Sequence, residues 1–211
     1  MRIIEPSFTI HGDVDGDAIL RNIEKFSRVC YKSENLINID SAKGFVAKIL
    51  QSGHESVIEH EKISVTIICD RGVTHEIVRH RIASYSQEST RYCNYAKNKF
   101  GNEITVIRPY FWKSDSEAYK IWHSTMVEIE KAYLKLIEIG TSPQEARSIL
   151  PNSLKTEIVV TMNLREWRHF FKLRTASAAH PQMRQISVPM LKRFKELISV
   201  VFDDIKCDFE Y

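Results

Sequence analysis

The sequence has no Gly-x-Gly pattern among its seven glycines and no Walker-type phosphate loop. These absences exclude a Rossmann dinucleotide site and a P-loop as the means of holding a phosphorylated ligand. No apolar run is long enough to cross a bilayer, and the opening MRIIEPSFTI lacks the charged start and hydrophobic middle of a signal peptide. We therefore expect a cytoplasmic protein that makes no contact with a membrane.

Cysteine is also scarce, and the four cysteines (Cys30, Cys69, Cys93 and Cys207) form no Cys-x-x-Cys pair. This spacing indicates neither a zinc site nor a disulfide framework, so we expect no metal. The segment His75 to His80 looks at first like a zinc-binding His-Glu-x-x-His helix. However, its second histidine follows the first by five positions, not four, and the two would lie on different sides of a helix. A metalloprotease is therefore unexpected.

The chain also lacks repeats, low-complexity tracts and Pro/Gly/Ser linkers. A length of 211 residues with 43% hydrophobic content is enough to bury one core, so we expect a single domain over residues 1–211. The net charge of +3 is mild. It suits small anionic substrates better than a nucleic-acid duplex, which would call for a strongly basic face.

Apolar periodicity and capping residues predict helices and strands in irregular succession. The expected helices cover about 41–51 with Ser41 as N-cap, 116–139, a short segment that begins at the Ser142 capping box and carries Arg147, 163–174, and 189–205. The expected strands cover residues 61–70 and 155–162. Without regular βαβ alternation, this order favours an α+β fold of mixed helices and an antiparallel sheet.

The most informative stretch is 79–92, RHRIASYSQESTRY, which concentrates arginine, histidine, hydroxyl and glutamine side chains. Arginine presents a fixed fork of donors to phosphate oxygens, serine and glutamine give short directional hydrogen bonds, and tyrosine offers a flat face for stacking. A phosphorylated nucleoside would satisfy all three kinds of contact.

This stretch resembles the signature of the flavin-dependent thymidylate synthases, Arg-His-Arg, two residues, Ser, one, Asn, two, Ser, one, Arg-Tyr. The residues that fit it are Arg79, His80, Arg81, Ser84, Ser89, Arg91 and Tyr92. Ser86 stands where the family pattern has asparagine. The resemblance implies a fold that holds its flavin without a Rossmann motif, between the subunits of a homotetramer.

A second block follows at 163–180, NLREWRHFFKLRTASAAH. If it is helical, Trp167, Phe170, Phe171 and Arg174 share one side, and Arg165, Arg168 and Lys172 take a different side. Arg174 would then lie on the face that is to be buried and would need a partner, either a carboxylate or a bound ligand. In the resembled family an arginine at this place acts on the uracil ring, which implies a catalytic role for Arg174.

The resemblance, to which Gly53-His54-Glu55-Ser56 is a third match, also implies which residues contact each ligand. The implied flavin contacts are His54, Ser56, Arg79, His80, Arg81, Gln87, Asn163, Arg165 and His169. The implied deoxyuridylate (dUMP) contacts are Glu76, Arg79, Gln87, Glu88, Ser89, Thr90, Arg91, Arg147 and Arg174. His180 falls in a stretch that the family uses near the flavin.

The implied reaction is the reductive methylation of dUMP to dTMP. Its implied components are FAD, NADPH as reductant and 5,10-methylenetetrahydrofolate as carbon donor, with no cysteine nucleophile.

Two alternatives stay open at this point. The Arg79–Tyr92 stretch could hold RNA, with Tyr85, Tyr92 and Tyr95 stacking on bases. Alternatively, one of Ser84, Ser86 and Ser89 could be a nucleophile, which would require a general base within hydrogen-bond reach.

Overall fold

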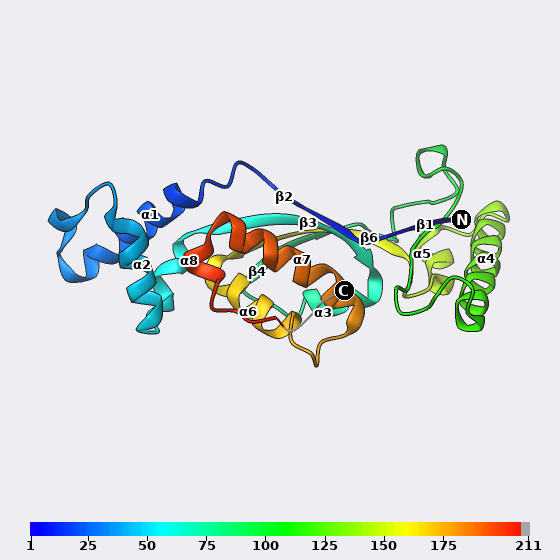
Figure 1. The fold of residues 1–211 in the computed structure, drawn as a ribbon. Helices are drawn as coiled ribbons and strands as arrows, with labels where there is room; N and C mark the ends of the chain where they lie inside the picture. The colour runs from blue at the N-terminus through cyan, green and yellow to red at the C-terminus, as the bar shows by residue number, and fades with distance from the viewer. Residues whose placement is uncertain (208–211) are drawn as a thin grey trace. The chain divides into compact units, whose positions relative to one another are not determined.

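The computed structural model describes residues 1–207, which form the mixed helices and sheets of an α+β protein (Figure 1). The strands are β1 (Arg2–Ile4), β2 (Ser7–Ile10), β3 (Lys62–Asp70), β4 (Ala83–Gln87), β5 (Thr105–Ile107) and β6 (Lys155–Asn163). The helices are α1 (Gly16–Arg28), α2 (Ser41–Gln51), α3 (Arg71–Ile77), α4 (Glu117–Glu138), α5 (Pro143–Ala146), α6 (Leu164–Arg174), α7 (Pro181–Leu197) and α8 (Ser199–Phe202). The predicted α+β class is confirmed.

The strands form a four-stranded sheet in the order β2-β3-β6-β4 and a two-stranded sheet of β1 and β5. The β1–β5 pair is parallel, with Ile3 opposite Val106. In the described part of the chain, residues 1–207, no helix combines the length and hydropathy needed to cross a bilayer.

The chain divides into two compact units, each made of separate segments. The first unit comprises residues 1–7, 67–79 and 86–159. The second unit comprises residues 8–66, 80–85 and the chain from Val160 onward. We describe each unit by itself, and the single domain expected from the sequence stays a prediction.

The core of the first unit is built on α4. Trp122, Met126 and Tyr133 of this helix are buried, and they cluster with Tyr95 and Leu154. Their spacing of three and four residues is that of a helix with one apolar side, as the sequence predicted. Ser116 caps the helix by accepting a hydrogen bond from the amide of Tyr119, so the predicted start is also confirmed.

The core of the second unit is aromatic. Trp167, Phe170 and Phe171 of α6 are fully buried and contact one another. Trp167 and Phe171 also contact Phe194 of α7. The buried indole of Trp167 donates to the carbonyl of Ile63 on β3 at 3.0 Å, which ties the helix to the sheet. Such ring pairs add about 0.5–1.5 kcal/mol each to the burial term, so they fix the position of α6 firmly.

The strand predicted over 61–70 is confirmed as β3. Its predicted inner side chains, Ile63, Val65, Ile67 and Cys69, are buried, whereas Ser64 and Thr66 are half-buried. The predicted helices 41–51 and 163–174 and the strand 155–162 are confirmed to within one residue at each end. The predicted capping box of Ser142 and Glu145 is present, and Arg147 lies in the 3₁₀ turn that follows α5.

Three predicted helix details are wrong. The last helix does not begin at Pro189, because α7 begins at Pro181 and carries Pro189 in its interior, where a buried face holds the helix together. It ends at Leu197, since Ile198 leaves the helical region with φ −143° and ψ 66°. Ser41 is not an N-cap, because Asp40 holds that place and the Ser41 hydroxyl donates instead to Glu24 at 2.8 Å.

Candidate functional site

The polar centre of the second unit is the imidazole of His80, which is 3% exposed. Its Nδ1 lies 3.0 Å from Oε1 of Glu166, and its Nε2 accepts a hydrogen bond from Nε of Arg174 at 3.1 Å. The ring also packs against His169 and Phe170, with ring centroids 5.4 and 5.0 Å away. The motif histidine is thus held between a carboxylate and a guanidinium, both of which come from α6.

Further contacts fix the backbone around this imidazole. The phenol of Tyr85 donates to the carbonyl of His80 at 2.6 Å, and burial raises the pKa of Tyr85 to about 12, so the phenol stays protonated. The hydroxyl of Ser187 donates to the carbonyl of Arg174 at 2.7 Å, and Asn163 caps α6 by accepting from the amide of Glu166 at 2.8 Å. The site therefore has little freedom to rearrange.

Burial lowers the pKa of His80, opposed by its hydrogen bond with Glu166, while the charges of Arg174 and His169 lower it further. The imidazole is therefore neutral at pH 7. Arg174 is half-buried at the end of α6, and one partner of this predicted buried cation is a neutral imidazole, not a carboxylate.

His80, Glu166 and His169 have ligand atoms within 4.8 Å of one another, a donor set of the kind that binds divalent metals. Arg174 opposes a metal at this place in two ways. Arg174 donates to Nε2 of His80, and its guanidinium would repel a second cation nearby. The geometry therefore suits an internal hydrogen-bonded chain better than a metal centre.

A cavity of about 460 Å³ opens beside this cluster in the second unit. Its lining residues are Glu55, Glu59, Ile82, Asn163, Arg165, Glu166, His169 and Lys172. The predicted flavin contacts Asn163, Arg165 and His169 are thus brought together on one wall. The lining mixes hydrogen-bond donors with acceptors, which fits the edge of a flavin ring. The predicted flavin contact Arg81 is exposed and precedes Ile82 of the lining, and its guanidinium is of the kind that pairs with phosphate.

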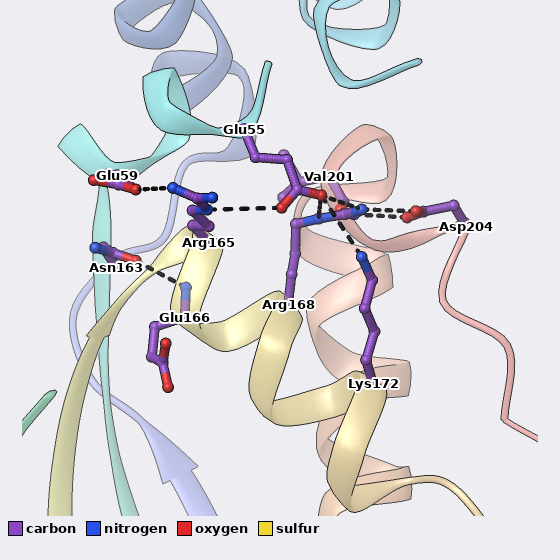
Figure 2. A network of polar contacts seen from close by, with 9 residues as sticks. All are labelled: Glu55, Glu59, Asn163, Arg165, Glu166, Arg168, Lys172, Val201 and Asp204. Carbon is purple, nitrogen blue, oxygen red and sulfur yellow. Dashed lines mark hydrogen bonds and ion pairs between the residues drawn. The ribbon is translucent and has the colours of Figure 1, made fainter. Parts of the chain in front are cut away.

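Figure 2 shows how the basic face of α6 meets the 3₁₀ helix Glu55–His60. Arg165 pairs with Glu59 at 2.5 Å, and Lys172 approaches Glu55 at 3.6 Å. Arg165 is exposed, so its pair is screened and a ligand can displace it. His54 and Ser56, the other predicted flavin contacts of this region, are exposed where this 3₁₀ helix begins.

Arg168 is buried, although the helical pattern predicted it on a different side from the face that is to be buried. Figure 2 shows its polar contacts. Its guanidinium makes a bidentate pair with Asp204 at 2.6 and 2.7 Å, donates to the carbonyl of Val201 and contacts Glu55 at 3.1 Å. α8 and the residues after it cover that side of α6, and the helical wheel of one isolated segment could not show this. Arg168 therefore ties Glu55 to the end of the described chain.

The first unit contains most of the predicted dUMP contacts, and the side chains of Gln87 and Glu88 are directed to protein partners. Gln87 donates to the hydroxyls of Thr74 and Thr156 at 3.1 and 3.2 Å. The carboxylate of Glu88 accepts from the phenol of Tyr95 at 2.8 Å and from the ammonium of Lys155 at 2.7 Å. These contacts leave the next residues in a fixed position at the end of β4.

The residues after Glu88 form a tight turn. The amides of Tyr92 and Cys93 donate to the carbonyl of Ser89 at 3.1 and 2.9 Å, and the amide of Arg91 lies 3.3 Å from the Ser89 hydroxyl. Thr90 is buried, whereas Arg91 is exposed and its Nε donates to Gln144 at 3.3 Å. Among the other predicted dUMP contacts of this unit, Arg79 and Arg147 are exposed and Glu76 is half-buried.

Both alternatives from the sequence lose support. Tyr95 is only 5% exposed and its hydroxyl binds Glu88, so it cannot stack on a base, and Tyr85 is half-buried. Of the three tyrosines proposed to stack, Tyr92 alone is exposed, at 76%. His80 cannot serve as a base for a serine, because both of its nitrogens are already bonded.

Four residues with supporting contacts were not predicted: Glu166 and Arg168 in the second unit, and Lys155 and Tyr95, both partners of Glu88, in the first. Of these residues, Glu166 alone could have been found from the sequence, since it lies three residues after an asparagine cap, where a capping carboxylate is common. In the structure its side chain reaches His80.

Comparison with known proteins identifies the family of this chain. Residues 17–198 match the family model described as thymidylate synthase complementing protein. The chain belongs to this family. The match takes in the Arg79–Tyr92 signature and the whole of α6, so both motif blocks lie inside it.

Among its relatives, the flavin-dependent thymidylate synthase of Pyrococcus abyssi is 42% identical over 157 residues, 74% of this chain and 64% of the relative. The flavin-dependent thymidylate synthase of Geobacter sulfurreducens is 34% identical over 185 residues, 84% of this chain and 78% of the relative. The chain spans less than two thirds of the length of the Pyrococcus abyssi and Pyrococcus furiosus proteins, 64% and 66%.

A solved structure shares the fold. A UMP/dUMP methylase from Streptomyces cacaoi, bound with 5-Br dUMP, superposes with a TM-score of 0.74 over 96% of both chains. Its sequence is 21% identical to this family member, so the likeness concerns the fold alone.

Proposed function

We propose that this protein is a flavin-dependent thymidylate synthase that methylates dUMP to dTMP. The observation that carries the proposal is the family match over residues 17–198, which contains every residue of the two motif blocks on which the predicted ligand contacts depend. The relatives that bear this enzyme name are 32–44% identical to the chain, and they support the assignment.

FAD is the cofactor of the proposed reaction, and the cavity of the second unit offers residues that fit it. Asn163 at the end of β6 and Arg165 and His169 of α6 would hold the flavin, helped by the exposed His54, Ser56 and Arg81 of the same unit. His80, Arg79 and Gln87 stay predicted flavin contacts. When bound, FAD supplies the hydride chemistry, with NADPH as the source of electrons and methylenetetrahydrofolate as the source of carbon. The protein supplies binding, orientation and charge.

The nucleotide contacts that we propose centre on the turn after β4. Ser89 and Arg91 would bind dUMP, with the amide of Thr90 as a further donor and with Glu76, Arg79 and Arg147 around them. Gln87 and Glu88 would hold this turn in place, since their side chains have protein partners. The cation of Arg174 would lie at the uracil ring, where it would favour the ring anion and enrich the double bond in electrons.

The proposed mechanism needs no cysteine nucleophile. Cys69 is fully buried, and burial raises the pKa of its thiol well above its ordinary value, so it stays protonated and unreactive. Arg174 would therefore activate the ring without a covalent enzyme adduct.

We also propose a cytoplasmic homotetramer with its ligand sites at subunit interfaces. Ile82 and Leu173 in the second unit are large apolar side chains that are 68% and 48% exposed, and Ile82 lines the cavity. Exposed apolar surface beside a ligand cavity supports contact with another copy of the chain.

The test is anaerobic incubation of the purified protein with FAD, NADPH, methylenetetrahydrofolate and dUMP, followed by chromatography of the nucleotides. We expect dTMP to form only when the protein holds FAD and when NADPH, methylenetetrahydrofolate and dUMP are all present. A protein that holds FAD yet gives no dTMP under any electron donor would refute the proposed function.

A further inference from the structure

The hydrogen bonds of His80 assign its proton. The Nε–H of arginine is always a donor, so Nε2 of His80 must offer a lone pair to the Arg174 contact at 3.1 Å. The proton of the neutral ring is then on Nδ1, from which it is donated to Glu166 at 3.0 Å. The opposite tautomer would place two N–H groups against each other and leave a lone pair facing a carboxylate.

Glu166 is placed to select this tautomer. Its side chain is 9% exposed, and its amide is fixed by Asn163, so the carboxylate is held where it faces Nδ1. An ionised carboxylate accepts hydrogen bonds but cannot donate one, so it stabilises the Nδ1–H form alone. The tautomer of His80 therefore depends on the side chain of Glu166, a residue that is not among the predicted ligand contacts.

The tautomer in turn orients Arg174. A guanidinium is planar, so a partner at Nε fixes the direction of the whole fork. Ser187 holds the backbone of Arg174 at the same time, through its carbonyl. Backbone and side chain of Arg174 are thus both fixed before any ligand binds.

We propose that Glu166 is a positioning residue, which holds His80 as the Nδ1–H tautomer so that Nε2 receives Arg174 and aims its guanidinium. The effect of Glu166 on turnover rests on the proposed function, in which Arg174 acts on the uracil ring. The ligand-free protein tests the structural part independently.

The first experiment is nitrogen NMR of the ligand-free protein labelled with [15N]histidine and [15N]arginine, with the His80 signal identified by its loss in His80→Gln. We expect the wild-type ring to be neutral at pH 7 with its proton on Nδ1, and the Nε–H of Arg174 to exchange slowly with water. A ring protonated on Nε2, or a charged imidazolium, would overturn the proposal without any variant being made.

The second experiment compares Glu166→Leu with Glu166→Gln. Leucine removes the acceptor, so we expect the Nε2–H form to appear and exchange at Nε of Arg174 to become at least tenfold faster. Glutamine keeps an oxygen that can accept from Nδ1, and it should retain most of the wild-type behaviour. Glu24→Gln removes another buried carboxylate of the same unit, away from the site, and should leave both signals unchanged.

Measurements of kcat distinguish a positioning role of Glu166 from a purely structural role. At saturating FAD and dUMP, Glu166→Leu should lower kcat about tenfold to a hundredfold, and glutamine should restore it, since small misplacements of a reacting group cost this much. A shifted tautomer with unchanged kcat would overturn the positioning role. If wild-type protein makes no dTMP, the proposed function fails, whereas the NMR result still decides what Glu166 does to His80 and Arg174.

Discussion

The two units hold their candidate residues in different ways. In the first unit, Gln87 and Glu88 direct their side chains to protein partners, and what they hold in place is a backbone turn with the Ser89 hydroxyl. In the second unit, His80 and Arg174 bond directly to one another through their side chains. The first arrangement suits the binding of a substrate by fixed donors, and the second suits control of charge at one guanidinium. Substitutions should therefore change affinity in the first unit and turnover in the second.

The largest effect should come from Arg174→Ala. Removing a cation that acts on developing ring charge should lower kcat about a hundredfold to a thousandfold, while FAD stays bound, because this charge matters most in the transition state. Steady-state kinetics together with the visible absorbance of the flavin would measure both quantities. Arg193→Ala removes an exposed arginine of α7 and should match the wild type. Full activity in Arg174→Ala would remove this residue from the mechanism.

A large effect on stability should come from Arg168→Met, which leaves Glu55 and Asp204 without their buried partner. Breaking a buried pair costs about 3–5 kcal/mol, and because Asp204 is 59% exposed we expect about 2–3 kcal/mol by urea unfolding. Arg165→Met, an exposed member of the same network, should change little. Equal losses in the two variants would contradict the distinction between buried and exposed partners.

The same variant gives a prediction on pH. The hydrogen bond from Arg168 lowers the pKa of Asp204 below its unfolded value of 3.8. The resulting stabilisation is complete above that value and is lost as the pH falls through the lower folded-state pKa. Wild-type stability should therefore fall more steeply below pH 4 than that of Arg168→Met. Parallel curves for the two proteins would refute this assignment.

In the first unit, Ser89→Ala should act on substrate binding. Loss of one neutral hydrogen bond is worth about 0.5–1.5 kcal/mol, so we expect kcat/KM for dUMP to fall up to about tenfold, with flavin binding unchanged. Ser124→Ala, on the exposed side of α4, is the control. Complete loss of activity, together with a trapped nucleotide adduct on the wild-type serine, would restore the nucleophile hypothesis.

The smallest effect should come from Tyr95→Phe, which removes the phenol that binds Glu88 and keeps the buried ring. The turn should loosen slightly, and KM for dUMP should rise a few-fold with kcat preserved, since one of two partners of Glu88 remains. Tyr119→Phe makes the same change elsewhere in the same core. A drop in kcat without a change in KM would place Tyr95 nearer the chemistry than we propose.

Much of the local structure could be predicted from the sequence, because it depends on local patterns. The alternation Ile63, Val65, Ile67 determines the buried face of β3, and the Ser142 capping box determines where α5 begins. Pro189 misled the prediction, since a proline often begins a helix, yet here the buried face of α7 keeps it inside one.

The residues of the candidate site could be predicted from the sequence, but the contacts between their side chains could not. The motifs place His80 and Arg174 in the site, but not the contact between them, which joins residues 94 positions apart. The burial of Arg168 likewise depends on α8 and Asp204, which no helical wheel of α6 contains. The sequence alone therefore did not determine which distant residues the charged side chains contact in the folded protein.

The most direct test of the proposed flavin and dUMP binding is the visible absorption spectrum of the purified protein, recorded before and after addition of dUMP. We expect an oxidised-flavin spectrum that shifts when the nucleotide is added, and a shift that weakens in Arg91→Ala while the flavin remains bound. A colourless protein that takes up no added FAD and does not respond to dUMP would contradict the proposed binding.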